Sequence, residues 1–188
     1  KDHDKLSPII RELSKIEEVK SIINNVNSRK ADVSYSDEQY ILYGDDFITE
    51  KLGKYKYKIS PDSFFQTNSK QAKKLYDIIK HEADLKGDEI VYDLYCGTGT
   101  IGIYLSDKAK KVFGFEIIPS AIDDAIINAS NNKTKNALFF QGDIKETLIN
   151  NKEIDIIEKP DVSIVDPPRS GLHPKALKNI VDLNQKKI

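Results

Sequence analysis

The sequence lacks the features that mark several classes of protein. Its single cysteine, Cys96, cannot form an internal disulfide, which fits a reducing compartment. It has no long apolar run, so a membrane span is not expected. Its formal net charge is −1, so bulk charge gives no argument for nucleic-acid binding. Methionine is absent and the first residue is Lys1, which predicts that the 188 residues belong to a longer chain.

One stretch organises the rest of the chain. Residues 90–94 form an apolar, β-prone run, Gly97-Thr98-Gly99 forms a glycine-rich turn, and residues 100–105 have helical character. A strand, a tight glycine turn and a helix in that order make a nucleotide-binding corner, because glycine lets the backbone approach a ligand closely. The start of the helix then presents free N–H groups to that ligand.

Strands and helices alternate after this corner. The expected strands are residues 112–116, 137–141 and 162–165, and the expected helices are residues 120–129 and 174–183. Such alternation is typical of a parallel sheet with right-handed crossovers, in which ligands bind at the carboxyl ends of the strands. We therefore predict an α/β, Rossmann-like domain over residues 61–188.

The first 60 residues are predicted to form a small α+β lobe. Periodicity indicates a helix over residues 8–18, a strand over 19–26, and a hairpin of strands 47–52 and 55–59. A loop over residues 60–68 leads into the α/β domain. Asn68, followed three residues later by Gln71, is typical of a helix N-terminus.

A row of lysines lies along the second strand of the expected hairpin. Because side chains alternate between the faces of a strand, Lys54, Lys56 and Lys58 share one face. A solvated face is the ordinary interpretation of such a row. A stripe that contacts RNA phosphates is the alternative, and the sequence leaves both open.

The glycine-rich turn is compatible with two cofactors. Gly97-x-Gly99-x-x-Gly102 matches the dinucleotide fingerprint, although this pattern alone has little specificity. Asp93 stands just before the glycines, where a carboxylate repels a pyrophosphate but suits the ammonium group of S-adenosylmethionine. Glu116 ends the second strand, where it can accept hydrogen bonds from the ribose hydroxyls of either cofactor.

Two further strand ends favour S-adenosylmethionine. Asp143 follows the third strand, near the expected adenine amino group, and Asp166 follows the fourth, outside any dinucleotide fingerprint. Pro167 and Pro168 stiffen the turn and so hold the Asp166 carboxylate in one pose. A strand-ending turn without a functional role is the alternative. Arg169 can grip a phosphate through two hydrogen bonds or form a structural ion pair.

Four motifs in this order resemble one family of enzymes. They are Ser63-Phe-Phe-Gln-Thr-Asn68, Asp93-Leu-Tyr-Cys-Gly-Thr-Gly-Thr100, Phe115-Glu116 and Asp166-Pro-Pro-Arg-Ser-Gly-Leu-His173. Together they are similar to the RNA 5-methyluridine methyltransferases, most of all the bacterial 23S ribosomal RNA uracil-5 enzymes. The resemblance covers about residue 60 to the end, and residues 1–60 resemble the family's central domain more loosely.

The resemblance implies roles for particular residues. The implied cofactor is S-adenosylmethionine, and its expected contacts are Gln66, Tyr95, Gly97, Gly99, Glu116, Asp143 and Asp166. The resemblance also implies that Gln66 and Asp166 contact the target base, and Arg169 is expected to contact the RNA through its guanidinium group. No metal is implied.

The family's catalytic residues are not matched in this chain. The family carries a nucleophilic cysteine after the fifth strand, which adds to C6 of uracil, and a glutamate base that removes the C5 proton. This sequence stops at residues 186–188, which resemble the start of that fifth strand, so the Rossmann-like core is expected to be truncated there. Cys96 lies beneath the cofactor's methionine end, has no cationic neighbour in sequence, and is expected to be a packing residue. We therefore expect the chain alone to be inactive.

Two other functions remain open from the sequence. A methyltransferase for an exocyclic base amine also favours a proline-rich motif at the fourth strand and needs no cysteine nucleophile. A catalytically inert RNA-binding module is the second alternative. The leading interpretation is the cofactor-binding part of a monomeric, cytoplasmic RNA uracil-5 methyltransferase, with ribosomal RNA favoured over transfer RNA and no membrane as a partner.

Overall fold

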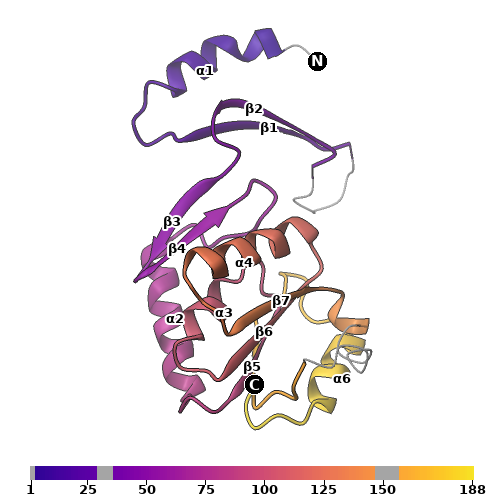
Figure 1. Cartoon of the computed structure of the whole chain (residues 1–188). Coiled ribbons are helices and arrows are strands. Elements are labelled where there is room, and N and C mark those ends of the chain that lie inside the picture. Colours follow the sequence, from indigo (N-terminus) through magenta and orange to yellow (C-terminus); the bar gives the residue numbers. More distant parts are fainter. Residues whose placement is uncertain (1–2, 29–35, 147–156) are drawn as a thin grey trace.

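The computed structural model describes residues 3–28, 36–146 and 157–188. It places a four-stranded parallel sheet among helices, with two antiparallel hairpins on the N-terminal side (Figure 1). A short 3-10 helix, η1 (His3–Leu6), precedes α1 (Ser7–Leu13), β1 (Ser21–Val26), β2 (Glu38–Gly44), β3 (Ile48–Leu52) and β4 (Tyr55–Ile59). The remaining elements are α2 (Ser69–Ala83), β5 (Ile90–Leu94), α3 (Thr100–Leu105), β6 (Lys111–Glu116), α4 (Pro119–Asn131), β7 (Ala137–Gln141), β8 (Val162–Val165) and α6 (Pro174–Asp182).

The parallel sheet has the strand order β7-β6-β5-β8. The chain runs outward from β5 through β6 to β7 and then returns to the other side of β5. All five residues of β5 are buried, as expected for a central strand covered on both faces. Beyond β8, Lys187 forms a parallel bridge with Val162. The reversal beside β5 is the position at which open α/β sheets bind their ligands.

Most of the predicted elements are present. The α/β fold with a parallel sheet is confirmed, and five elements have the predicted bounds, namely β4, β5, α3, β7 and β8. The helix expected over residues 8–18 is wrong in length, because α1 ends at Leu13. No residue of α1 is buried, so packing does not extend it, and a short helix without packing is marginal. The strand expected from residue 19 begins at Ser21.

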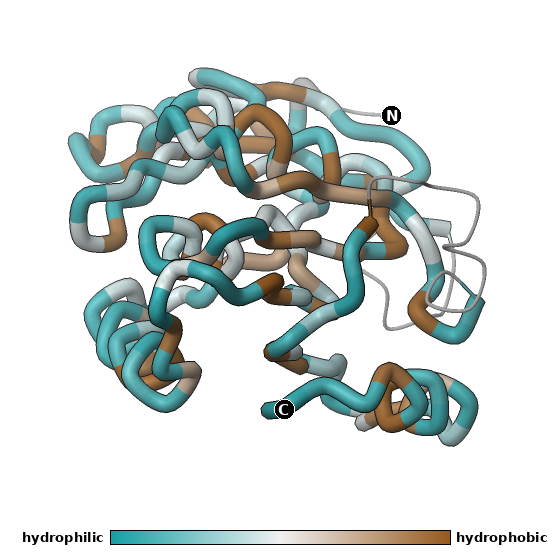
Figure 2. Tube along the Cα trace, turned by 60° about the horizontal axis from the view of Figure 1, so that its bottom comes forward, coloured by the Kyte–Doolittle hydropathy of each residue, from teal (hydrophilic) through white to brown (hydrophobic). Residues whose placement is uncertain are grey.

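Two hydrophobic clusters cover the two faces of the sheet. One joins the β3–β4 hairpin to α2, α3 and α4, and the other joins β5 and β6 to α6. Tyr57 of the hairpin is fully buried in the first cluster, and its hydroxyl donates to the Thr100 carbonyl oxygen at 3.1 Å. Apolar stretches gather toward the middle of the trace (Figure 2). The hairpin therefore shares a core with the α/β unit, and the division at residue 60 stays a prediction.

Helix α4 holds the outer edge of β4 through side-chain amides. Both backbone groups of Lys58 pair with Asn128, whose Oδ1 accepts at 2.6 Å and whose Nδ2 donates at 3.0 Å. Asn132 pairs in the same way with Lys56, at 2.9 and 2.6 Å. Residues four apart on a helix are separated by about 6.0 Å, and alternate residues of a strand by about 6.6 Å. The two periods nearly match, so the helix serves β4 as a neighbouring strand would.

Asp124 extends this series by one helical turn. Its buried carboxylate accepts hydrogen bonds from the Ser60 N–H and from the hydroxyls of Ser60 and Ser63, each at 2.9 Å. It also pairs with Lys58 Nζ at 3.3 Å. The loop after β4 is thereby fixed to α4, and this fixes where the residues further along the loop lie.

Candidate functional site

The carboxyl ends of the four parallel strands meet at one edge of the sheet. The polar residues that stand there are Tyr95, Glu116, Asp143 and Asp166. The electrostatic effects between them agree with this placement. Burial is the main cause of the raised pKa values of Asp93 and Tyr95, and the negative charges add to it: Glu116 and Asp166 act on Asp93, and Asp143 acts on Tyr95. The structure therefore brings together the strand-end residues that the sequence singled out.

The glycine turn has a backbone that favours glycine. The φ angles of Gly97 and Gly99 are +52° and +76°, in the left-handed region. A Cβ on Gly99 would lie 2.7 Å from the ring of Phe139, so a larger residue does not fit. Tyr95 also has a positive φ, +65°, which is uncommon for a residue with a side chain. Backbone strain at this edge of the sheet is therefore confined to Tyr95, while the two glycines adopt their conformation without strain.

Asp93 is fully buried at the end of β5. Its Oδ2 accepts a hydrogen bond from the N–H of Gly102 in α3 at 2.7 Å, and its Oδ1 has no partner. A Cβ at residue 102 would lie 3.0 Å from Oδ2, which explains the glycine there. Burial raises the pKa of Asp93 to about 7, with smaller contributions from Asp166 and Glu116, while the Gly102 hydrogen bond opposes the shift.

Glu116 is held in place by three backbone N–H groups. Oε2 accepts from Gly97 at 3.2 Å, and Oε1 accepts from Ile117 at 2.7 Å and Ile118 at 3.0 Å. A carboxylate has about four lone-pair directions, so acceptor capacity remains. The bond to Gly97 links the end of β6 to the glycine turn, which places the carboxylate beside the expected cofactor position.

Asp143 and Asp166 stand in different environments. Burial acts to raise the pKa of Asp143, but hydrogen bonds and charge from Lys145 outweigh it and hold that pKa below its usual range. The Asp143–Lys145 ion pair is 2.9 Å long. Partial burial raises the pKa of Asp166. Arg169 is exposed and forms no ion pair with any described residue, so its alternative as a structural ion pair has no support here.

The loop after β4 reaches the glycine turn. The carbonyl oxygen of Phe64 lies 3.8 Å from the position that a Cβ on Gly97 would take. Phe64 is 69% exposed, whereas Phe65 packs into the core. Gln66 is half-buried, and its side chain forms no hydrogen bond with any described residue. The loop therefore passes the glycine turn at Phe64, whose exposed ring is a candidate that the sequence analysis did not single out.

The charge of the site selects among possible ligands. Four carboxylates lie at the strand ends, and only Asp143 has a cationic partner among the described residues. A negative cluster disfavours the pyrophosphate of a dinucleotide and suits S-adenosylmethionine, which carries a sulfonium and an ammonium group. The unpartnered, buried Oδ1 of Asp93 points to the same kind of ligand. No group of three potential metal ligands occurs within residues 3–28, 36–146 and 157–188.

Comparison with known proteins agrees with this geometry. The family model described as tRNA (Uracil-5-)-methyltransferase matches residues 11–186. The chain belongs to this family. An uncharacterized RNA methyltransferase of Clostridium tetani is 44% identical over 178 residues, which is 95% of this chain and 38% of the relative. One of Chlorobaculum tepidum is 41% identical over 172 residues, or 92% of this chain and 36% of the relative.

A solved structure supports both the fold and the cofactor. The tRNA (uracil-54, C5)-methyltransferase of Pyrococcus abyssi, in complex with S-adenosyl-L-homocysteine, is 35% identical with a TM-score of 0.68. The match covers 92% of this chain and 41% of that enzyme, so the chain spans less than half the length of the relatives named above. S-adenosylmethionine is the expected cofactor, as the sequence predicted.

Cys96 is a packing residue, as the sequence predicted. Its side chain is 5% exposed, and its sulfur would lie 3.0 Å from a Cβ on Gly114 of β6. Burial raises the pKa of its thiol well above the usual value, and the nearby negative charges add to this shift. A thiol in this environment is a poor nucleophile at neutral pH.

No helix in the described parts of the chain is long and apolar enough to cross a membrane.

Proposed function

We propose that this chain is the cofactor-binding part of an enzyme that transfers a methyl group from S-adenosylmethionine to C5 of a uridine in RNA. The observation that carries the proposal is the meeting of the glycine turn, four strand-end carboxylates and the loop at Phe64 at one edge of the sheet. Family membership and the Pyrococcus abyssi neighbour support the same reaction.

Each strand end has a role in binding the cofactor. We assign Glu116 to the ribose hydroxyls, because its carboxylate is fixed by Gly97 yet keeps acceptor capacity. Asp143 faces the adenine end, and Gly97 and Gly99 let the backbone approach the methionine end. Tyr95 covers the cofactor between these groups. The bound cofactor supplies an electrophilic methyl group.

The target uracil is assigned to the open side of this site. Asp166 can accept a hydrogen bond from uracil N3–H, and Gln66 offers an amide to the base edge. The exposed ring of Phe64 offers a surface on which an unstacked base can lie. Arg169, exposed and without an ionic partner in the described residues, is assigned to an RNA phosphate.

The finer parts of the function are also proposals. The motifs favour 23S ribosomal RNA as the substrate, whereas the Pyrococcus abyssi neighbour carries the name of a transfer RNA enzyme. The only cysteine, Cys96, is buried and has no role as nucleophile, so the 188-residue chain is proposed to bind cofactor without transferring a methyl group. A reduced, buried thiol fits a cytoplasmic location.

Calorimetry and methyl transfer test this function in two steps. The chain is titrated with S-adenosylmethionine, S-adenosylhomocysteine and NAD, and binding of the first two but not of NAD is expected. Tight NAD binding would overturn the cofactor assignment. In the second step, the longer protein to which this chain is proposed to belong is incubated with labelled S-adenosylmethionine and with 23S ribosomal RNA or transfer RNA. Label at uracil C5 is expected, and label on a base amine would favour the N-methyltransferase alternative.

A further inference from the structure

Lysines gather on one face of the β3–β4 hairpin and at the adjoining end of α4. We call Lys51, Lys54, Lys56, Lys58 and Lys133 the lysine face. Four of them line a groove of about 700 Å³ between the hairpin and α4, together with Phe47, Thr49, Ile127, Asn131 and Asn132. No carboxylate lines this groove, although acidic residues outnumber basic ones in the whole chain.

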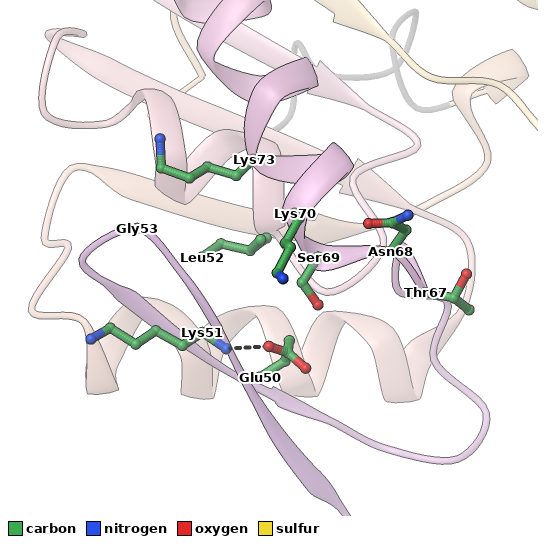
Figure 3. Close-up of a pocket in the computed structure, with 9 residues that line it drawn as sticks. All are labelled: Glu50, Lys51, Leu52, Gly53, Thr67, Asn68, Ser69, Lys70 and Lys73. Carbon is green, nitrogen blue, oxygen red and sulfur yellow. Dashed lines mark hydrogen bonds between the residues drawn. The ribbon is translucent and has the colours of Figure 1, made fainter.

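A second groove lies next to Lys51, which is the one member of the lysine face that lines it. It measures about 610 Å³ and lies between β3 and the start of α2 (Figure 3). Lys51, Lys70 and Lys73 line it, and Glu50 is its single acidic residue. Figure 3 shows the Glu50 carboxylate accepting a hydrogen bond from the Lys51 backbone N–H, at 3.0 Å, while the Lys51 side chain extends away from it. Glu50 therefore does not neutralise Lys51.

Like charges are held side by side on this face. Lys51 and Lys56 are directly opposite in the β3–β4 register, so their side chains share one face of the hairpin. Like charges in this position destabilise a sheet. Lys54 pairs with Asp107 at 2.9 Å and Lys58 with Asp124 at 3.3 Å. By contrast, no acidic partner exists for the other three members among the described residues.

The lysine face leads directly to the candidate site. Lys56 and Lys58 are alternate residues of β4, about 6.6 Å apart along the strand, and Lys54 stands in the turn just before it. The chain then enters the loop that passes the glycine turn at Phe64 and continues to Gln66. A partner that lies along β4 therefore passes toward the position assigned to the target base. Extended, regularly spaced negative charge is what fits this row, and a nucleic-acid backbone has it.

We propose that the lysine face binds the phosphate backbone of the RNA segment next to the target uridine. This inference rests on the proposed function for the identity of the RNA. It resolves the alternative that the sequence left open for Lys54, Lys56 and Lys58 in favour of phosphate binding. Lys51, Lys56 and Lys133, which have no acidic partner among the described residues, carry most of the interaction, since they lose no ion pair when a phosphate approaches.

Fluorescence anisotropy with a labelled single-stranded, uridine-containing RNA tests the proposal. The double variant Lys56→Gln/Lys133→Gln is compared with Lys159→Gln/Lys178→Gln, which removes the same charge from exposed residues at the other side of the sheet. The lysine-face variant should bind RNA about tenfold more weakly. Its plot of log affinity against log salt should be shallower by about 1.4, or about 0.7 for each lost phosphate contact. The control should match the parent.

Two outcomes would overturn the proposal. One is equal RNA affinity and salt slope for the lysine-face variant and its control. The other is an oligoglutamate peptide that binds as tightly as RNA with the same dependence on Lys56 and Lys133, which would indicate an acidic protein partner. S-adenosylmethionine affinity, measured in parallel, should be unchanged in both variants. If the unsubstituted chain does not bind S-adenosylmethionine, the proposed function is refuted. The RNA anisotropy measurement would still decide whether the lysine face binds RNA.

Discussion

Asn128 hydrogen-bonds to both backbone groups of Lys58, although 70 residues separate the two in sequence. The same amide nitrogen also donates to the Thr98 carbonyl oxygen at 3.2 Å. One buried side chain therefore joins the β3–β4 hairpin, helix α4 and the glycine turn. The conformation of the turn depends on a residue that lies outside all four family motifs.

Replacing Asn128 by alanine should destabilise the fold. The change removes the Asn128 partner of the buried Thr98 carbonyl and of the part-buried Lys58 N–H and carbonyl, which costs about 3 kcal/mol. Urea unfolding measures this loss. Asn131→Ala is the matched control, because Asn131 lies on the exposed side of the same helix. Equal stability of the two variants would contradict the role given to Asn128.

Replacing Glu116 by alanine should weaken S-adenosylmethionine binding. Hydrogen bonds to a charged group contribute on the order of 1.5–3 kcal/mol each, so a loss of about tenfold to a hundredfold is expected. The glycine turn also loses its contact with Oε2, which adds to the effect. Isothermal titration calorimetry measures the change, with the exposed Glu82→Ala as control. Parent-like affinity of Glu116→Ala would show that β6 does not end at the cofactor.

Stability should fall as pH rises through the range in which Asp93 ionises. An unfolded aspartate has a pKa of about 3.9, whereas burial raises the pKa of Asp93 to about 7 in the folded protein. Between these values the folded state binds the extra proton, so stability is lost from about pH 4 to about pH 7, by roughly 2–4 kcal/mol from this group. Urea unfolding at about pH 5 and about pH 8 measures the difference.

Asp93→Asn should remove most of that pH dependence, because the amide oxygen can still accept from Gly102 without carrying a charge. Asp123→Asn, on the exposed side of α4, is the control and should keep it. An Asp93→Asn variant with the parent's pH dependence would mean that other groups cause the loss.

Cys96 should be unreactive in the folded chain. Burial and neighbouring negative charge raise its thiol pKa, so little thiolate forms and reagents cannot reach it. A disulfide reagent should modify the thiol only after denaturation, whereas an exposed Lys159→Cys variant should react at once. An RNA that contains 5-fluorouridine should give no covalent adduct with the chain. An adduct through Cys96 would refute the packing role.

The sequence predicted the parallel sheet well because its signals are local. Apolar runs bounded by turns gave β5, β7 and β8 their bounds, and the glycines located the turn before α3. The helix N-terminus predicted at Asn68 is also present. Asn68 is the N-cap of α2, and its Oδ1 accepts a hydrogen bond from the Gln71 N–H at 3.1 Å. The length of α1 was wrong, because periodicity does not show whether a helix has anything to pack against.

Other features depend on contacts between distant segments. The burial of Asp93 is decided by α3 and β6, and a sequence position alone gives no pKa. The spacing of Asp124, Asn128 and Asn132, each four residues apart on a helix, was a signal that could have been noticed. The function of this spacing, which is to bond the backbone and the following loop of β4, can be recognised only once β4 is known to lie beside α4. The role of Phe64 likewise needed its exposure beside Gly97.

The pairing of α4 with β4 has a consequence for how the molecule behaves in concentrated solution. An open strand edge offers N–H and C=O groups that can recruit a strand from another molecule, which leads to aggregation. On β4 the backbone groups of Lys56 and Lys58 are already bonded to Asn132 and Asn128. The helix thus closes an edge that a two-stranded hairpin would otherwise leave available for intermolecular strand pairing.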